Sequence, residues 1–167
     1  VHVGDTASQL LSLTNNVAND GFSESLNASL GGATGGVTTN GGSFTQLAAA
    51  GTDNTSLSVG IDTSTAGSKN GTATISLASD GTGSSGLGTT VLASQTVNVT
   101  GGVYRYASPT GHTPEPVSFG NVHVGDTASQ LLSLTNNVAN DGFSESLNAS
   151  LGGATGDATT NGGSFTQ

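Results

Sequence analysis

An internal repeat constrains this chain more than any other feature of its sequence. Residues 1–46 (the first block) recur as residues 122–167 (the second block), and the two blocks agree at 44 of 46 positions. They differ where Gly36 and Val37 become Asp157 and Ala158. The offset of 121 residues far exceeds the period of about 20 to 50 residues in solenoid repeats. It matches the size of an independent domain, so the sequence predicts tandem domains of 121 residues.

The prolines suggest where one repeat ends and the next begins. All three lie close together in the chain, at Pro109, Pro114 and Pro116. Proline stiffens linkers and is excluded from central strands. We therefore expect a first repeat over residues 1–106 that lacks its opening strand residues, a linker over residues 107–115, and the N-terminal part of a second repeat over residues 116–167. Two explanations of the incomplete second repeat stay open: a window cut from a longer polymer, or a domain completed by a neighbour's strand.

Apolar residues alternate with small polar residues along much of the chain. The pattern is clearest over residues 26–30, 57–61, 73–77 and 91–99. Alternation with period two is typical of strands that bury one face, whereas each frequent glycine would cost a helix about 1 kcal/mol. Asn70-Gly71 has the composition of a tight hairpin turn. We predict an all-β chain, built as an Ig-like antiparallel β-sandwich of about seven strands in each period.

The composition argues against several classes of function. Lys69 and Arg105 are the only lysine and arginine in a chain with a net charge of −9, too few for the basic face that binds nucleic acid. The absence of cysteine removes disulfides and thiolate chemistry. No apolar run approaches the roughly 20 residues of a membrane-spanning helix. No nucleophile, phosphate-loop or zinc-protease motif occurs, so we expect no enzymatic activity.

Oxygen-bearing side chains gather in one part of each block. In the first block they are Asn16, Asn19, Asp20 and Glu24. Calcium takes six to eight oxygen ligands of this kind, so these four residues form a candidate Ca²⁺ site, and no other cofactor is expected. The competing interpretation is that Asn and Asp simply form turns here.

The few large side chains are the candidates for contacts between repeats, because aromatic residues bury the most area per residue. The predicted interface residues are Phe22, Phe44, Tyr104, Tyr106, Val117 and Phe119.

The segment VSFGNVHVGDTASQLLSLTN at residues 117–136 resembles a known family. Its Phe-Gly-Asn-Val opening, Val-Gly-Asp turn and Leu-x-Leu-Thr-Asn strand are similar to immunoglobulin-like repeats of the choice-of-anchor D type, in the ASH-like sandwich group. The resemblance implies a repeat of a large bacterial surface or filament protein, located outside the cell. It implies no catalytic residues.

Together these observations favour a structural function. We expect an extracellular filament, stalk or matrix fibre whose repeats assemble end to end with copies of themselves, with strand complementation as one route. The alternative is an adhesin module that binds a glycan or a host or abiotic surface, with Ca²⁺ as a candidate ligand. The lack of tryptophan and the few aromatic residues make the sugar-binding alternative weaker.

Overall fold

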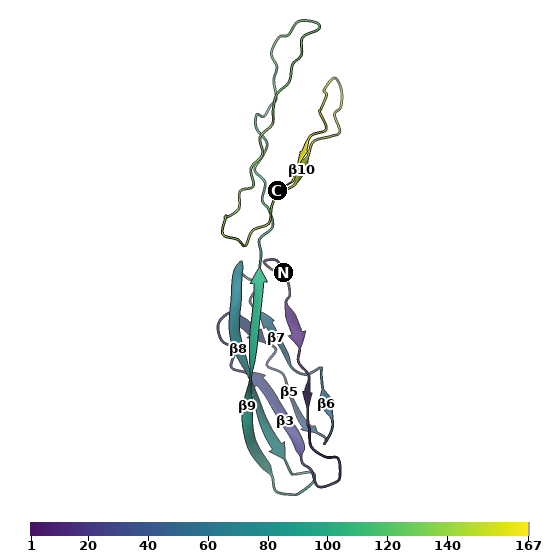
Figure 1. Ribbon diagram of the computed structural model, residues 1–167, viewed down its shortest axis with the longest axis vertical. Coiled ribbons are helices and arrows are strands. Elements are labelled where there is room, and N and C mark those ends of the chain that lie inside the picture. Colours follow the sequence, from purple (N-terminus) through teal and green to yellow (C-terminus); the bar gives the residue numbers. More distant parts are fainter. Residues whose placement is uncertain (167) are drawn as a thin grey trace. The chain divides into compact units, whose positions relative to one another are not determined.

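The computed structural model describes residues 1–166, and those residues form strands and loops without a helix. The chain divides into two compact units, one from Val1 to Val103 and one from Tyr104 onward. Most of the strands lie in the first unit (Figure 1). The named strands all pair antiparallel, in agreement with the predicted all-β architecture.

The first unit contains three sheets. The largest has the strand order β5-β3-β8-β9 (Figure 1). Its strands are β5 (Ser43–Leu47), β3 (Ser25–Gly31), β8 (Gly67–Asp80) and β9 (Thr89–Val103). A second sheet has the order β1-β7-β4, with β1 (Ser8–Leu10), β7 (Ser58–Ile61) and β4 (Val37–Thr39). A short third sheet pairs β2 (Leu13–Thr14) with β6 (Thr52–Asp53).

The core consists of side chains that pack between the four-stranded and the three-stranded sheet. Strands β3 and β8 contribute one half, and β4, β7 and the residue before β7 contribute the other. The buried cluster consists of Ala28, Leu30, Val37, Leu57, Val59, Ala73 and Ile75. Packing of apolar faces from two sheets against each other is the arrangement expected of a β-sandwich, and it uses the alternation seen in the sequence.

The predicted alternation holds in β3 and β8 and fails in the first half of β9. Val97 and Val99 pack against the core, but Val91, predicted on the same face, is 86% exposed. The register shifts between Ile75 and Leu77 of β8, which pair with Gln95 and Leu92 of β9. The extra residue is a bulge in β9, and a bulge reverses which side chains face the core.

The hairpin turn predicted at Asn70-Gly71 is wrong. Both residues lie inside β8, paired with Thr100 and Val99 of β9. The glycine serves a close backbone approach instead. A Cβ atom at Gly71 would lie 2.1 Å from the backbone oxygen of Thr34. Glycine within a strand often marks such an approach.

The second unit holds fewer strands. A two-stranded sheet joins β10 (Ala149–Ser150) and β11 (Ser164–Phe165). Its pairs Ala149–Phe165 and Ser150–Ser164 match the pairs Ala28–Phe44 and Ser29–Ser43 between β3 and β5, residue for residue across the repeat. This sheet has only those two strands, and most side chains of the second block are exposed.

Replacing Gly71 with alanine tests the close approach inside β8. Gly71→Ala should destabilise the first unit by about 1 to 3 kcal/mol, the usual cost of overpacking, because the atom nearest to the new methyl group is the backbone oxygen of Thr34, which cannot turn aside as a flexible side chain can. Gly83→Ala is the matched control, since a Cβ atom there meets nothing within 4 Å. Urea denaturation followed by circular dichroism measures both variants. Equal midpoints for the two would contradict the packing described here.

Candidate interface between repeats

The two blocks form the same local structure in their different surroundings. Identical turns and side-chain contacts recur at an offset of 121 residues. The matched hydrogen bonds are Asn15 Nδ2 to Glu24 O (3.0 Å) and Asn136 Nδ2 to Glu145 O (2.9 Å), Phe22 N to Asp20 Oδ1 and Phe143 N to Asp141 Oδ1 (both 3.0 Å), and Leu30 N to Gly42 O (2.9 Å) and Leu151 N to Gly163 O (2.8 Å). These short-range contacts follow from the local sequence alone.

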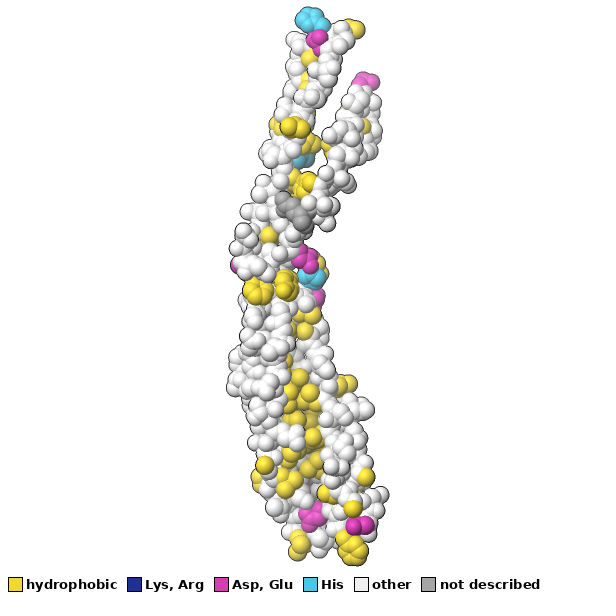
Figure 2. Space-filling model, in the orientation of Figure 1, with side chains coloured by type: hydrophobic (Ala, Val, Ile, Leu, Met, Phe, Trp, Pro, Cys, Tyr) yellow, Lys and Arg dark blue, Asp and Glu magenta, His cyan; other side chains and the backbone are white. Residues whose placement is uncertain are grey.

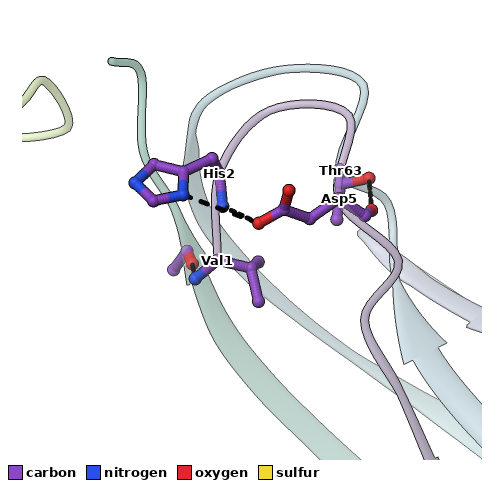
Figure 3. Close-up of polar contacts among 5 residues, drawn as sticks. Val1, His2, Asp5 and Thr63 are labelled. Carbon is purple, nitrogen blue, oxygen red and sulfur yellow. Dashed lines mark hydrogen bonds and ion pairs between the residues drawn. The ribbon is translucent and has the colours of Figure 1, made fainter. Parts of the chain in front are cut away.

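The turn that opens each block shows what the larger fold adds. In the first block the His2 N–H donates to Asp5 Oδ2 at 2.7 Å, and Thr63 Oγ1 donates to the Asp5 carbonyl at 2.6 Å (Figure 3). In the second block the His123 N–H donates to Asp126 Oδ2 at 3.0 Å. The His2 side chain is 27% exposed and that of His123 is 99% exposed. The turn thus forms in both blocks, and the first unit shelters it.

A stretch that we call the connecting segment, residues 104–113, pairs with the second block. The Thr110 N–H donates to Thr135 O at 2.8 Å, and Thr113 and Ser133 exchange two backbone hydrogen bonds of 3.0 and 2.8 Å. The Asn137 N–H donates to Ser108 O at 2.7 Å. Pro109 has no N–H of its own, and its two neighbours make the pairing instead: the Ser108 carbonyl accepts a hydrogen bond and the Thr110 N–H donates one. Within the predicted linker over residues 107–115, Ser108, Thr110 and Thr113 are therefore hydrogen-bonded to the second block, with isolated β-bridges at Pro109 and Thr113.

Arg105 fastens the beginning of the connecting segment to the same block. Its N–H donates to Phe143 O at 2.8 Å, and its carbonyl accepts the Glu145 N–H at 2.9 Å. Its Nη1 donates to Asp141 Oδ2 at 2.7 Å and to Ser144 Oγ at 3.4 Å. The hydrogen bond from Arg105 lowers the pKa of the Asp141 carboxyl below its ordinary value. Backbone hydrogen bonds and a charged side-chain hydrogen bond thus both bind Arg105 to the turn at residues 141–145.

Tyr104 places an aromatic contact beside this ion pair. Its ring lies 5.6 Å from the ring of Phe143, centroid to centroid, at an interplanar angle of 45°. This spacing is within the range at which aromatic pairs attract each other. The matching residue of the first block, Phe22, is 93% exposed. The same turn therefore has a phenylalanine ring that packs against Tyr104 in the second block and an exposed ring in the first block.

The six predicted interface residues are divided among these surroundings. Tyr104 contacts Phe143 in the aromatic pair just described. Phe22 is the first-block residue that matches Phe143. Tyr106 is 61% exposed in the connecting segment, and Val117 and Phe119 lie outside any strand, 37% and 49% exposed. Phe44 is partly buried against the core. Their role in an interface between repeats stays a prediction.

Phe44 lines a shallow apolar cavity of about 340 Å³ on the first unit. Ala28, Leu77 and Val91 contribute further apolar lining, so the cavity spans β3, β5, β8 and β9. Figure 2 shows hydrophobic side chains gathered over the middle of this unit. The surface that the cavity exposes is mostly apolar.

The candidate calcium ligands have separate partners in the structure. Asp20 accepts the Phe22 N–H, which is the turn interpretation. Glu24 accepts hydrogen bonds from Ser79 Oγ at 2.6 Å and from Ser85 Oγ. Asn16 and Asn19 are exposed. Within residues 1–166 no group of three His, Cys, Asp or Glu side chains is placed to hold a metal. Calcium binding stays a prediction.

Glu24 instead connects the start of β3 with the end of β8, at one end of the four-stranded sheet. The serine hydroxyls that it accepts from lie at the end of β8 and in the loop after it. These hydrogen bonds, from Ser79 first and then Ser85, lower the pKa of the Glu24 carboxyl below its ordinary value, while burial and the nearby Asp80 raise it. Because hydrogen bonds to the charged form prevail, folding favours the ionised carboxylate.

Sequence reasoning missed Arg105 and Asp141. The available signal was that Arg105 is the chain's only arginine and is flanked by two tyrosines. No sequence pattern indicated which of the eleven acidic residues it would meet.

In comparisons with protein-family models, curated proteins and solved structures, no significant match to this chain was found. The resemblance to choice-of-anchor D repeats therefore stays a prediction from the residues at positions 117–136. Across residues 1–166, no helix has the length and apolar character needed to cross a membrane.

Acid should destabilise the first unit through Glu24. Its pKa in the folded state lies below the ordinary value of 4.5, so its contribution is complete above that value and is lost as the pH falls through the lowered pKa. Glu24→Gln should therefore flatten the decline of the unfolding temperature between about pH 5 and pH 3. Asp157→Asn is the control, because it removes an exposed carboxyl from the second unit and leaves Glu24 and its serine partners unchanged. Parallel pH profiles for Glu24→Gln and the unmodified chain would contradict this role.

Proposed function

We propose that this chain is part of a tandem array of structural domains, each an Ig-like β-sandwich, that forms an extracellular filament, stalk or matrix fibre. The observation that carries the proposal is the pairing of the connecting segment with the second block. In that pairing the chain that follows β9 is bonded to the next copy of the repeat through backbone hydrogen bonds and isolated β-bridges. A joint of this kind supports regular addition of units better than a flexible tether would.

The near-identity of the blocks supports the same function. Selection for a binding or catalytic site acts on a few residues, whereas a load-bearing array needs each unit to make the same contacts. The turns and side-chain hydrogen bonds that recur in both blocks are of this type. The protein partner in this proposal is another copy of the repeat, and the proposal includes no catalytic step.

The surface composition agrees with a role outside the cell. Charged residues make up 8% of the chain, and Gly, Ser, Thr and Asn together make up about half. Such a surface draws little on ion pairs, so backbone ladders and apolar burial carry its stability. A bacterial surface location comes from the resemblance at residues 117–136 and is part of the proposal.

Chains of one, two and three complete periods of 121 residues test this function. Small-angle X-ray scattering should show the maximum dimension increasing by a constant increment for each added period, because ordered joints keep successive domains in a repeated geometry. A flexible string would instead extend roughly as the square root of the number of periods, and a collapsed globule would grow more slowly still. Either of those results would overturn the proposal. Micrographs of the three-period chain provide an independent length.

A further inference from the structure

The extended segment of residues 12–16, which contains β2, has two edges, and a different edge is hydrogen-bonded in each block. In the first block Leu11 and Asn15 direct their backbone groups to the segment around β6. The Asn15 N–H donates to Gly51 O at 2.9 Å, and the Ala50 N–H donates to Asn15 O at 2.9 Å. The backbone N–H and C=O groups of successive residues point to opposite edges of a strand. Those of Ser12, Thr14 and Asn16 therefore point to the edge that faces away from β6.

In the second block the opposite edge is the one that is paired. The residues that bond to the connecting segment are Ser133, Thr135 and Asn137, which correspond to Ser12, Thr14 and Asn16. The two pairings therefore use different edges of one strand, so a complete repeat can make both together. In the first unit the sheet of β2 and β6 has only those two strands, and the outer edge of β2 is open.

The turn beside that edge matches as well. Residues 141–145 hold Arg105 and Tyr104 through Asp141, the Phe143 ring and two backbone hydrogen bonds. Residues 20–24 of the first block have the same sequence and the same Asp–Phe turn, with a 3.0 Å hydrogen bond from the Phe22 N–H to Asp20. Their Phe22 ring is 93% exposed. We call the outer edge of residues 12–16 together with this turn the acceptor surface.

We infer that the acceptor surface of the first block binds the connecting segment of another copy of this chain. The incoming segment adds an antiparallel strand to the outer edge of residues 12–16, places its Arg105 on Asp20 and packs its Tyr104 on Phe22. This inference rests on the proposed function and names the contact by which one repeat joins the next.

Charge and the identity of the contacting residues both favour this occupant over an unrelated partner. The chain has a net charge of −9 and one arginine, and that arginine lies in the segment that reaches the acidic turn. In the second block every contact of the proposed docking is made by residues identical to those of the first block. Strand addition with a side-chain anchor at one end is a common mode of segment recognition.

A peptide of residues 102–116, added to the ¹⁵N-labelled full chain, tests the inference. The amide signals of Ser12, Thr14, Asn16 and residues 20–24 should shift in a saturable way. The matching amides of the second block are an internal control and should shift less, because their own connecting segment is covalently attached and present at high effective concentration. Absence of shifts at the first block, or shifts at the second block alone, would overturn the inference.

Single N-methyl groups in the peptide test the pairing edge. Methylation of the Thr110 nitrogen removes the donor that bonds to Thr135 O in the second block and should weaken binding about tenfold. Methylation of the Gly111 nitrogen is the matched control, since this N–H makes no backbone hydrogen bond within residues 1–166. Equal affinities for the two peptides would contradict the proposed edge.

Substitutions test the side-chain anchors. An Arg105→Ala peptide should bind about two- to fivefold more weakly to the unmodified chain, and the Asp20→Asn chain should lose the same factor for the unmodified peptide. The control chain Asp141→Asn should bind the unmodified peptide at the first block as the unmodified chain does. Unchanged affinity for both Arg105→Ala and Asp20→Asn would contradict the ion pair.

Failure of this inference differs from failure of the proposed function. If the peptide does not bind while two- and three-period chains still lengthen by constant increments, the array is structural and its joint lies elsewhere. If the peptide binds while those chains collapse, the contact exists and the function is wrong.

Discussion

The structure depends most on the pairing of β8 with a strand on each side. β8 bonds to β3 along seven residue pairs and to β9 along most of its length, and it supplies Ala73 and Ile75 to the core. Backbone groups buried beside that core need partners, and β8 provides them for two neighbours at once. Where β8 is present its neighbours extend to 7 and 15 residues. In the two-stranded sheet of the second unit, β10 and β11 have 2 residues each.

The nearly identical blocks separate what local sequence determines from what a partner determines. Turns closed by side chains, such as those at Asp20 and Asp141, form in both blocks because their donor and acceptor are two residues apart. Long strands with buried side chains form only in the first unit, where strands from distant parts of the chain pair with one another. Local hydrogen bonds cost little chain entropy, whereas a strand pair closes a long loop and needs burial to offset that cost.

This distinction explains how much of the fold could be predicted from the sequence. Alternation in β3 and β8 predicted buried faces, because every second residue there meets the opposite sheet. It failed at Val91, since a bulge is set by the pairing with β8 and leaves no mark in a single strand's pattern. The composition of Asn70-Gly71 predicts a turn, whereas the close approach of Gly71 to Thr34 involves residues far apart in the chain. A local pattern cannot indicate such a contact. The pairing of Arg105 with Asp141 spans 36 residues and escaped prediction for the same reason.

The joint that we infer has a direction, and this property decides what kind of assembly it makes. Its donor follows β9, and its acceptor lies near residues 12–24, so the two halves are different surfaces. Contacts between different surfaces do not close into a two-fold dimer, and they continue as an open polymer unless the rotation between units closes a ring. A covalent array of the same units removes the loss of translational freedom at each joint, so a contact as small as one short strand, one ion pair and one aromatic pair suffices there. The same contact between separate chains would be weak, and length would come from the tandem repeat itself.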